Sequence, residues 1–249
     1  MIILEEDKIM IPIEAYFSYR LKDRKEIDEE LIKKLKDDER YLKAYRSCLR
    51  KLSVKDHTVR QISDHLCRTE LNEKQKKEII DKLTAYGMLD DEKYAENKIA
   101  FYDRSNLSVR EIKNRLKKDG ISERIISRYI REDEMREKEK ALLVAEKYAK
   151  SIKNKSLISK KQSIVNKLLN AGYSYEMSKN VVNTLEIEEN NEIELLQKEF
   201  LKSLKKYAKK YEGYELRQRI YGSLLNKGFG SEDIKRVMEE NDRETSKGF

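Results

Sequence analysis

The chain has few residues that interrupt helices and no apolar segment long enough to cross a membrane. Its 249 residues include one proline and eight glycines, so most of the sequence is free to be helical. The longest apolar runs, such as Ala141 to Ala145, have five residues, whereas a membrane-spanning helix needs about 20. No basic segment followed by an apolar one opens the chain, so we expect a cytoplasmic protein with no membrane partner.

Side chains that commonly carry chemistry are also scarce. The two cysteines, Cys48 and Cys67, fit a reducing compartment and are interpreted as thiols without a chemical role. His57, His65 and Cys67 lie near one another in sequence but lack a paired Cys-x-x-Cys spacing, so we expect no metal site. No glycine-rich phosphate loop, nucleophile elbow or zinc-protease motif occurs, so we expect neither an enzyme nor a cofactor.

The balance of charged and apolar residues points away from one compact globule. Charged residues make up 41% of the chain and apolar residues 38%, which suits an elongated array with much surface for its volume. The apolar residues are periodic rather than sparse, which argues against disorder. The net charge of +8 suggests a polyanionic partner.

A pattern of apolar residues and glycine recurs along the chain. In this pattern, apolar residues occupy positions i and i+4, a glycine occupies position i+8, and a third apolar residue occupies position i+9. The copies begin at Ile62, Ile112, Ile164 and Ile220, with spacings of 50, 52 and 56 residues, and in the first copy Glu70 replaces the glycine. Such a period with helical apolar spacing predicts stacked helical modules, because one module cannot bury its apolar face alone.

These features predict a mainly α protein, an elongated tandem array of three-helix modules with a small N-terminal β-hairpin. Alternating apolar residues at 2–4 and 9–13 predict the hairpin, with Pro12 in an edge strand. A short helix is expected over 28–38, and a long one follows from Tyr41. The predicted domains are residues 1–40 for the hairpin and short helix, and 41–90, 91–139, 140–190 and 191–243 for three-helix repeats 1 to 4.

The segment from Gly87 to Ala95 joins two of the modules. Gly87 can end a helix through the left-handed backbone conformation. Asp90 or Asp91 can cap the next helix, where a carboxylate also meets the positive end of the helix dipole. Tyr94 and Ala95 then open a buried face. The segment therefore predicts a helix end, a cap and a new helix.

Three segments together resemble the RecX family, bacterial regulators of the RecA recombinase. They are Gly87 to Ala95, Ser108 to Leu116 with its capping box, and Lys118 to Ser122. The resemblance covers about residues 41–240, and the N-terminal hairpin with Lys25 to Glu30 resembles the extension of longer members. Glu70, in place of the turn glycine, departs from the pattern.

The resemblance implies a non-enzymatic protein that binds RecA filaments on single-stranded DNA. It implies that the protein lies along the filament groove and reduces recombinase, ATPase and co-protease activity. We expect it to act as a monomer and to bind single- and double-stranded DNA weakly and without sequence preference. A DNA-binding helical-repeat protein without a recombinase partner is the alternative, and a scaffolding repeat protein is a third possibility, which the basic stretches disfavour.

Three basic stretches are candidate contacts to DNA or to the RecA filament. Between Lys147 and Tyr175 there are seven lysines and no acidic residue. Lysines give sequence-independent affinity for phosphates, although a solvated helix face is the other interpretation. The candidate contact residues are Arg104, Arg110, Arg115, Lys117, Lys118, Lys147, Lys150, Lys153, Lys155, Lys160, Lys161, Lys167, Lys205, Lys206, Lys209 and Lys210.

Four tyrosines lie among basic residues near the end of the chain. They are Tyr207, Tyr211, Tyr214 and Tyr221. Aromatic rings between basic residues can stack on nucleic-acid bases. In a thin helical array, however, a tyrosine more often packs its ring and leaves its hydroxyl in water, and we prefer that interpretation.

Overall fold

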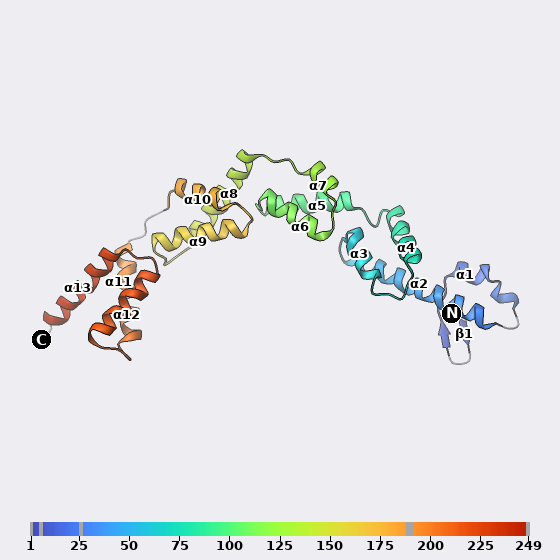
Figure 1. The fold of residues 1–249 in the computed structure, drawn as a ribbon, viewed down its shortest axis with the longest axis horizontal. Helices are drawn as coiled ribbons and strands as arrows, with labels where there is room; N and C mark the ends of the chain where they lie inside the picture. Colours follow the sequence, from blue (N-terminus) through green and yellow to red (C-terminus); the bar gives the residue numbers. More distant parts are fainter. Residues whose placement is uncertain (1, 5–6, 25–26, 188–191, 248–249) are drawn as a thin grey trace. The chain divides into compact units, whose positions relative to one another are not determined.

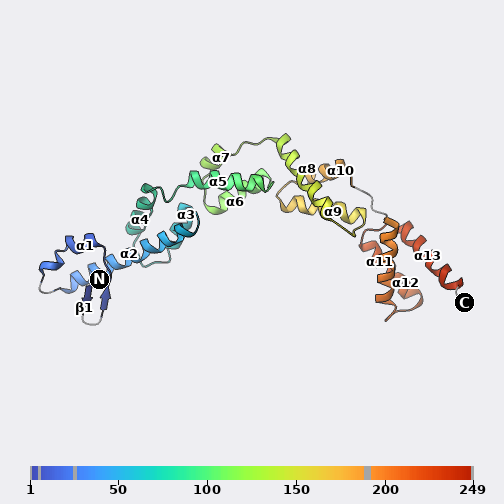
Figure 2. The same cartoon turned by 180° about the vertical axis from the view of Figure 1, so that it is seen from behind.

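The computed structural model describes residues 2–4, 7–24, 27–187 and 192–247 (Figure 1, Figure 2). Within these ranges the chain is mainly α, as predicted. The elements are β1 (Ile2–Leu4), β2 (Asp7–Ile9), α1 (Ile13–Ser18), the 3-10 helix η1 (Leu21–Asp23), α2 (Glu29–Val54), α3 (Val59–Leu66), α4 (Glu73–Ala85), α5 (Asp91–Arg104), α6 (Val109–Asp119), α7 (Glu123–Tyr129), α8 (Glu134–Ser151), α9 (Leu157–Asn170), α10 (Tyr175–Thr184), α11 (Glu192–Tyr207), α12 (Gly213–Asn226) and α13 (Ser231–Lys247).

Two short strands precede the helices. β1 and β2 pair antiparallel, with Ile2 opposite Ile9, and residues 5–6 between them lie outside the described residues. The second strand spans Asp7–Ile9, so the predicted strand over 9–13 is misplaced and shares only Ile9 with it. Pro12 instead precedes the first helical residue of α1, with φ −56°. A proline at a helix start loses nothing, because the N–H that it lacks would have no partner within the helix.

Helix α2 runs unbroken through the break that the sequence predicted near residues 38–41. No glycine or proline occurs between Asp28 and Val54, so no residue there ends the helix. The Asp28 side chain caps it by accepting from the N–H of Leu31 at 2.7 Å. The expected boundary between residues 40 and 41 therefore lies inside one helix. Leu35 packs with Ile9 near its start, and Cys48 packs in the core formed with α3 and α4.

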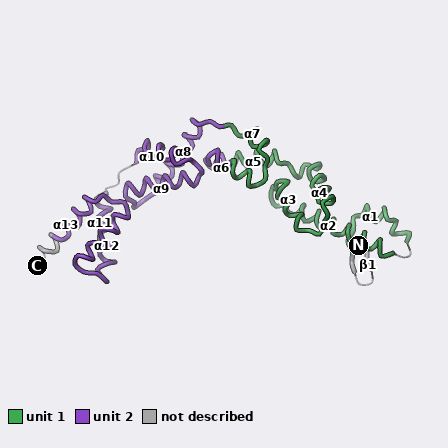
Figure 3. The backbone as a smooth tube through the Cα atoms, viewed as in Figure 1, with its two compact units in different colours: residues 1–101, 113–131 green, residues 102–112, 132–249 purple. Residues whose placement is uncertain are grey.

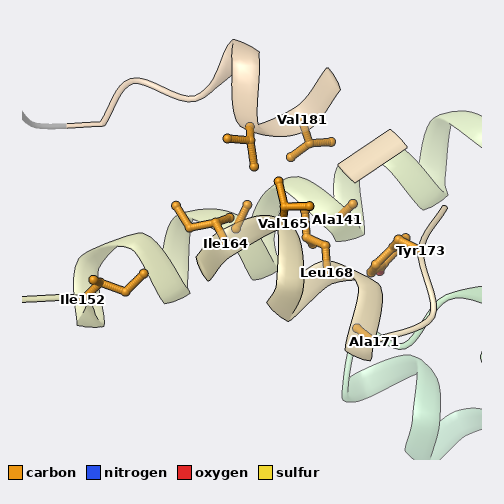
Figure 4. Close-up of a cluster of buried hydrophobic side chains, with 10 residues drawn as sticks. Ala141, Ile152, Ile164, Val165, Leu168, Ala171, Tyr173 and Val181 are labelled. Carbon is orange, nitrogen blue, oxygen red and sulfur yellow. The ribbon is translucent and has the colours of Figure 1, made fainter. Parts of the chain in front are cut away.

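The helices after α1 fall into four sets of three in chain order, which we call triplets 1 to 4. They are α2–α4, α5–α7, α8–α10 and α11–α13. In each triplet the predicted apolar pair of the middle helix is buried, from Ile62 and Leu66 to Ile220 and Leu224. Figure 4 shows the core of triplet 3, where Ile164, Leu168 and Tyr173 lie together. The helical periodicity thus marks the buried faces correctly.

The chain divides into two compact units, residues 1–101 with 113–131 and residues 102–112 with 132–249 (Figure 3). The division passes through α6. The expected module boundary after residue 139 falls inside α8, which begins at Glu134. In the described part of the chain, no helix combines the length and apolar character that crossing a membrane requires.

Candidate nucleic-acid interface

The start of the middle helix α3 is held by residues of the next triplet. Thr58 caps α3: its Oγ1 accepts from the N–H of Gln61 at 3.2 Å and donates to the carbonyl of Asp119 at 2.6 Å. The N–H of Val59 donates to the Asp91 carboxylate at 2.9 Å. Asp91 begins α5 and Asp119 ends α6. One hydroxyl and one N–H at the start of a helix therefore position triplet 2 on triplet 1.

Gly120 follows Asp119 and completes this contact. Its φ of +95° is one that glycine adopts without strain. A Cβ at this position would lie 2.4 Å from Cδ of Arg60 in α3. Glycine is therefore required at position 120 for two reasons: the turn needs a positive φ, and α3 approaches too closely for a side chain.

The same arrangement recurs between α6 and the third triplet. The N–H of Ser108 donates to the carbonyl of Ala171 at 3.0 Å. The N–H of Val109 donates to the Glu137 carboxylate at 2.8 Å. Gly172 has φ +92°, and a Cβ there would lie 2.4 Å from Cβ of Glu111. These residues repeat the positions of their counterparts at α3.

A third copy lies between α9 and the fourth triplet. The hydroxyls of Ser156 and Ser159 both donate to the carbonyl of Lys227 at 2.6 Å. The N–H of Leu157 donates to the Glu192 carboxylate at 3.2 Å. Gly228 has φ +81°, and a Cβ there would lie 2.8 Å from Oγ of Ser156. We call each of the three arrangements a junction: a Ser or Thr cap, a backbone N–H bound to a carboxylate, and a close-packed turn glycine.

The two ends of the described triplets lack the junction residues. The turn of triplet 1 has Glu70 where the later triplets have glycine, and no described triplet precedes it to make the close contact. Helix α12 of triplet 4 has Glu212 at its N-cap, with no side-chain cap hydrogen bond. Within the described residues, the turn at Glu70 meets no preceding triplet, so no close contact there requires glycine.

The basic residues from Lys147 to Lys167 lie on α8, α9 and the segment between them. Six of the seven lysines are exposed. Within the described residues, none of those six amino groups has a carboxylate within ion-pair distance. Nζ of Lys155 donates to Oγ of Ser163 at 2.8 Å, and Nζ of Lys167 lies 5.7 Å from the centroid of the Tyr148 ring. The exposed lysines therefore keep their charge available to an anionic partner.

Lys160 differs from its neighbours. Its side chain lies on the buried face of α9 with Ile164 and Leu168, and the residue is 7% exposed. The sequence predicts Lys160 as a contact residue together with the exposed lysines. That prediction considers its charge but not the face of the helix on which it lies. The structure makes Lys160 a poor candidate for phosphate contact.

The remaining basic candidates are exposed in both units. Arg104 and Arg110 belong to the second unit, and Arg115, Lys117 and Lys118 to the first. Lys117 forms an ion pair with Glu123 at 2.7 Å. The four lysines at the end of α11 and after it, Lys205, Lys206, Lys209 and Lys210, are exposed as well.

The four tyrosines of triplet 4 lie in different environments. Tyr207, Tyr211 and Tyr221 are half-buried. Nζ of Lys206 lies 5.0 Å from the Tyr207 ring centroid, and Cζ of Arg219 lies 4.9 Å from that of Tyr211. Tyr214, in contrast, is 78% exposed. Packing therefore explains the positions of Tyr207, Tyr211 and Tyr221. It does not explain the exposed ring of Tyr214.

Of the three residues considered for metal binding, His57 and His65 are half-buried and hydrogen-bonded, whereas Cys67 is exposed. Nε2 of His65 is 2.8 Å from Oγ of Ser47, and Nδ1 of His57 is 3.1 Å from Oε1 of Gln61. Burial raises the pKa of the Cys48 thiol. In the described ranges, no three histidine, cysteine or acidic side chains gather as a metal site would require.

Comparison with known proteins identifies the family. The family model described as the third three-helix domain of RecX matches residues 190–238. Regulatory protein RecX of Streptococcus sanguinis strain SK36 is 30% identical over 245 residues, which are 95% of this chain and 92% of that protein. The chain belongs to the RecX family.

Other RecX proteins extend this relationship. Regulatory protein RecX of Lactococcus lactis subsp. lactis strain IL1403 is 30% identical over 246 residues, 95% of this chain and 90% of that protein. A solved structure, the crystal structure of regulatory protein RecX, covers 70% of this chain and 86% of its own, with a TM-score of 0.54 and 22% identity. The resemblance found in the sequence is confirmed, and RecX proteins are regulatory proteins rather than enzymes.

Three acidic residues of this RecX chain were not recognised as junction residues from the sequence. Asp91, Glu137 and Glu192 each reach the middle helix of the preceding triplet. Asp90 caps its own helix by accepting from the N–H of Lys93 at 3.0 Å, whereas burial raises the pKa of the Asp91 carboxyl. Acidic residues in a first helical turn are common, so the sequence carried no specific signal for this contact.

Proposed function

We propose that this RecX-family chain binds RecA filaments on single-stranded DNA and mainly inhibits RecA recombinase, ATPase and co-protease activity. The relationship to RecX proteins over 95% of the chain carries the proposal. Acting on RecA would place the protein in the cytoplasm, and we propose that it acts as a monomer.

The junctions support binding along a helical groove. A ligand that follows a filament must present several contact surfaces at fixed spacing. Each junction holds neighbouring helices through hydrogen bonds between side chains and backbone groups and through a glycine that admits no side chain, so within each unit the spacing of the contact surfaces is built into the chain. We further propose that the triplets form an elongated array with the β-hairpin at its start. X-ray scattering should give a radius of gyration well above the roughly 18 Å of a compact protein of this length, and a value near 18 Å would contradict the array.

The exposed basic residues would supply weak contacts to DNA phosphates. The lysines between Lys147 and Lys167, except Lys160, are exposed and lack carboxylate partners in the described part of the chain. Lysine contacts to phosphate carry no sequence information and weaken with salt. We therefore propose sequence-independent binding to single- and double-stranded DNA through these residues, the exposed arginines and lysines of α5 and α6, and the lysines that follow Leu204.

The test is RecA ATP hydrolysis on single-stranded DNA with and without this protein. We expect inhibition at protein concentrations that leave most of the DNA unbound in the absence of RecA. Inhibition that appears only when the protein saturates the DNA would favour the alternative, a DNA-binding repeat protein that competes with RecA for DNA. Raising the DNA concentration separates the two, because excess DNA relieves competition but not filament binding.

A further inference from the structure

We propose that the groove between α12 and α13 binds an unpaired nucleobase, so that triplet 4 distinguishes single-stranded from double-stranded nucleic acid. The inference rests on the DNA contact proposed above, but not on RecA. The groove has a volume of about 280 Å³ and is lined by one face of α12 and by Lys235, Met238 and Glu239 of α13.

Tyr214 offers an aromatic surface in this groove. It is 78% exposed, and its hydroxyl accepts from Nε2 of Gln218 at 2.7 Å. This hydrogen bond restrains the ring, so that little side-chain entropy is lost when a base stacks on it. Tyr221, further along the same face, is half-buried, and its hydroxyl lies 2.7 Å from Oγ of Ser231. A flat, restrained and exposed ring is what base stacking needs.

Helix α12 carries no junction. In triplets 1 to 3 the N-cap residue and the first N–H of the middle helix bind residues of the following triplet. At α12 the N-cap is Glu212, without a side-chain cap bond, and a Cβ on Gly213 would meet nothing within 4 Å. Among the described residues, α12 is the middle helix whose first turn has no triplet on it. Within the described residues, the N-terminus of α12 is therefore not bound by another triplet.

The charges of the groove favour a base over a phosphate. Arg217 is already paired with Asp242, and Glu239 contributes a carboxylate to the lining, so the groove has no excess positive charge. Amide and carboxylate groups such as those of Gln218 and Glu239 are suited to the hydrogen-bonding edges of bases.

The lysines just before α12 would hold the phosphates. Lys205, Lys206, Lys209 and Lys210 are exposed, and within the described residues none has a carboxylate partner. Lys210 is three residues before Gly213, where α12 begins. A strand whose phosphates lie on these lysines can turn one base toward Tyr214. Bases of a duplex are already stacked and paired, so they cannot enter the groove without unpairing.

The test is fluorescence anisotropy of the full-length chain, without RecA, on a labelled oligothymidylate of about 20 nucleotides and on a duplex of equal length. We expect Tyr214→Ala to weaken single-strand binding about tenfold, as the loss of one stacked base would, and to leave duplex binding unchanged. Tyr214→Phe should retain most of the affinity. Tyr175→Ala is the matched control, since Tyr175 in α10 is also exposed, at 61%, but does not line the groove.

Several outcomes would overturn the proposal. An equal loss on both ligands would assign Tyr214 to general stability, and so would an equal loss for Tyr175→Ala. If Tyr214→Ala weakened RecA inhibition but not single-strand binding, the groove would hold a protein segment instead of a base. Because the assay contains no RecA, a wild-type chain that fails to inhibit RecA would contradict the proposed function alone and leave this inference standing.

Discussion

The two units use the same junction with different side chains. In the first unit, the carboxylate of Asp119 accepts from Nε2 of Gln61 and from the hydroxyl of Tyr94, both at 3.1 Å. In the second unit, the corresponding turn residue at the third junction is Lys227, whose Nζ pairs with Glu199 at 2.7 Å. The turn residue is thus acidic in one junction and basic in the other. What stays the same is the cap hydroxyl on the turn carbonyl, the backbone N–H bound to a carboxylate, and the turn glycine, so these determine how triplets pack.

The units also differ in the groups available to solvent. Both histidines of the chain, His57 and His65, belong to the first unit. The lysines from Lys147 to Lys167 and the exposed Tyr214 belong to the second. The histidines thus all lie in the first unit, whereas most of the proposed nucleic-acid contacts lie in the second.

The largest effect is expected from Gly120→Val, which removes the first junction. A β-branched residue at positive φ is strained by about 1 kcal/mol or more, and its Cβ would also collide with Arg60. We expect a lower Tm and a loss of RecA inhibition that exceeds the loss of DNA binding, because groove binding needs the triplets in register.

Gly87→Val is the matched control for this change. Gly87 has φ +67°, so the strain is similar, but a Cβ there meets nothing within 4 Å. It should lower the Tm less and spare inhibition. If the two variants behaved alike in thermal unfolding and in the RecA ATPase assay, backbone strain alone would matter and the junction would not.

Removing the cap hydroxyl should affect the first junction more than the third. Thr58→Ala should cost about 1–2 kcal/mol, because the carbonyl of Asp119 loses its donor and α3 loses its cap. Ser156→Ala should cost less, since Ser159 also donates to the carbonyl of Lys227. Hydrogen exchange of the α3 and α9 amides would measure both. Thr58→Ser keeps the hydroxyl and should exchange like wild type, and a larger loss in α9 than in α3 would refute the redundancy.

Replacing Lys153, Lys155 and Lys161 together by Gln should weaken DNA binding and flatten its dependence on salt. For single strands the slope of log affinity against log salt should fall by about 0.7 for each phosphate that the variant no longer binds. Lys160→Gln, on the same helix as Lys161 but buried, should leave the slope unchanged. A slope that is also unchanged in the triple variant would reassign the exposed lysines to an ordinary solvated helix face.

The smallest effect is a loss of stability of the first unit at mildly acidic pH. Burial lowers the pKa of His57 and of His65 in the folded chain. A histidine with a lowered folded pKa stabilises the fold fully above its unfolded pKa, about 6.5, and that stability is lost as the pH falls toward the folded value. Hydrogen exchange at pH 7.5 and pH 5.5 should therefore show faster opening of α3 than of α9, after correction for intrinsic rates. Equal changes in both helices would contradict this assignment, and His65→Gln should reduce the difference.

Local signals predicted the helical part of the fold well. Residues such as Ile164 and Leu168 are buried where the periodicity placed them, and Gly120, Gly172 and Gly228 all adopt positive φ. The errors arose where a local signal was absent or weak. The absence of glycine and proline between Asp28 and Val54 is a weak signal that permits one helix without requiring it, and Pro12 fits a helix start as well as an edge strand.

The helical class, the repeat, the turn glycines and the membership of the RecX family could all be inferred from the order of the amino acids. These features follow from periodicity and backbone preference, which act over a few residues. What lies against each helix start became known only from the packing of the folded chain. The Thr58 hydroxyl reaches a carbonyl 61 residues away, Lys160 turns inward, and the exposed Tyr214 lines a groove between α12 and α13. Such contacts depend on how whole triplets pack, and no short stretch of sequence encodes that packing.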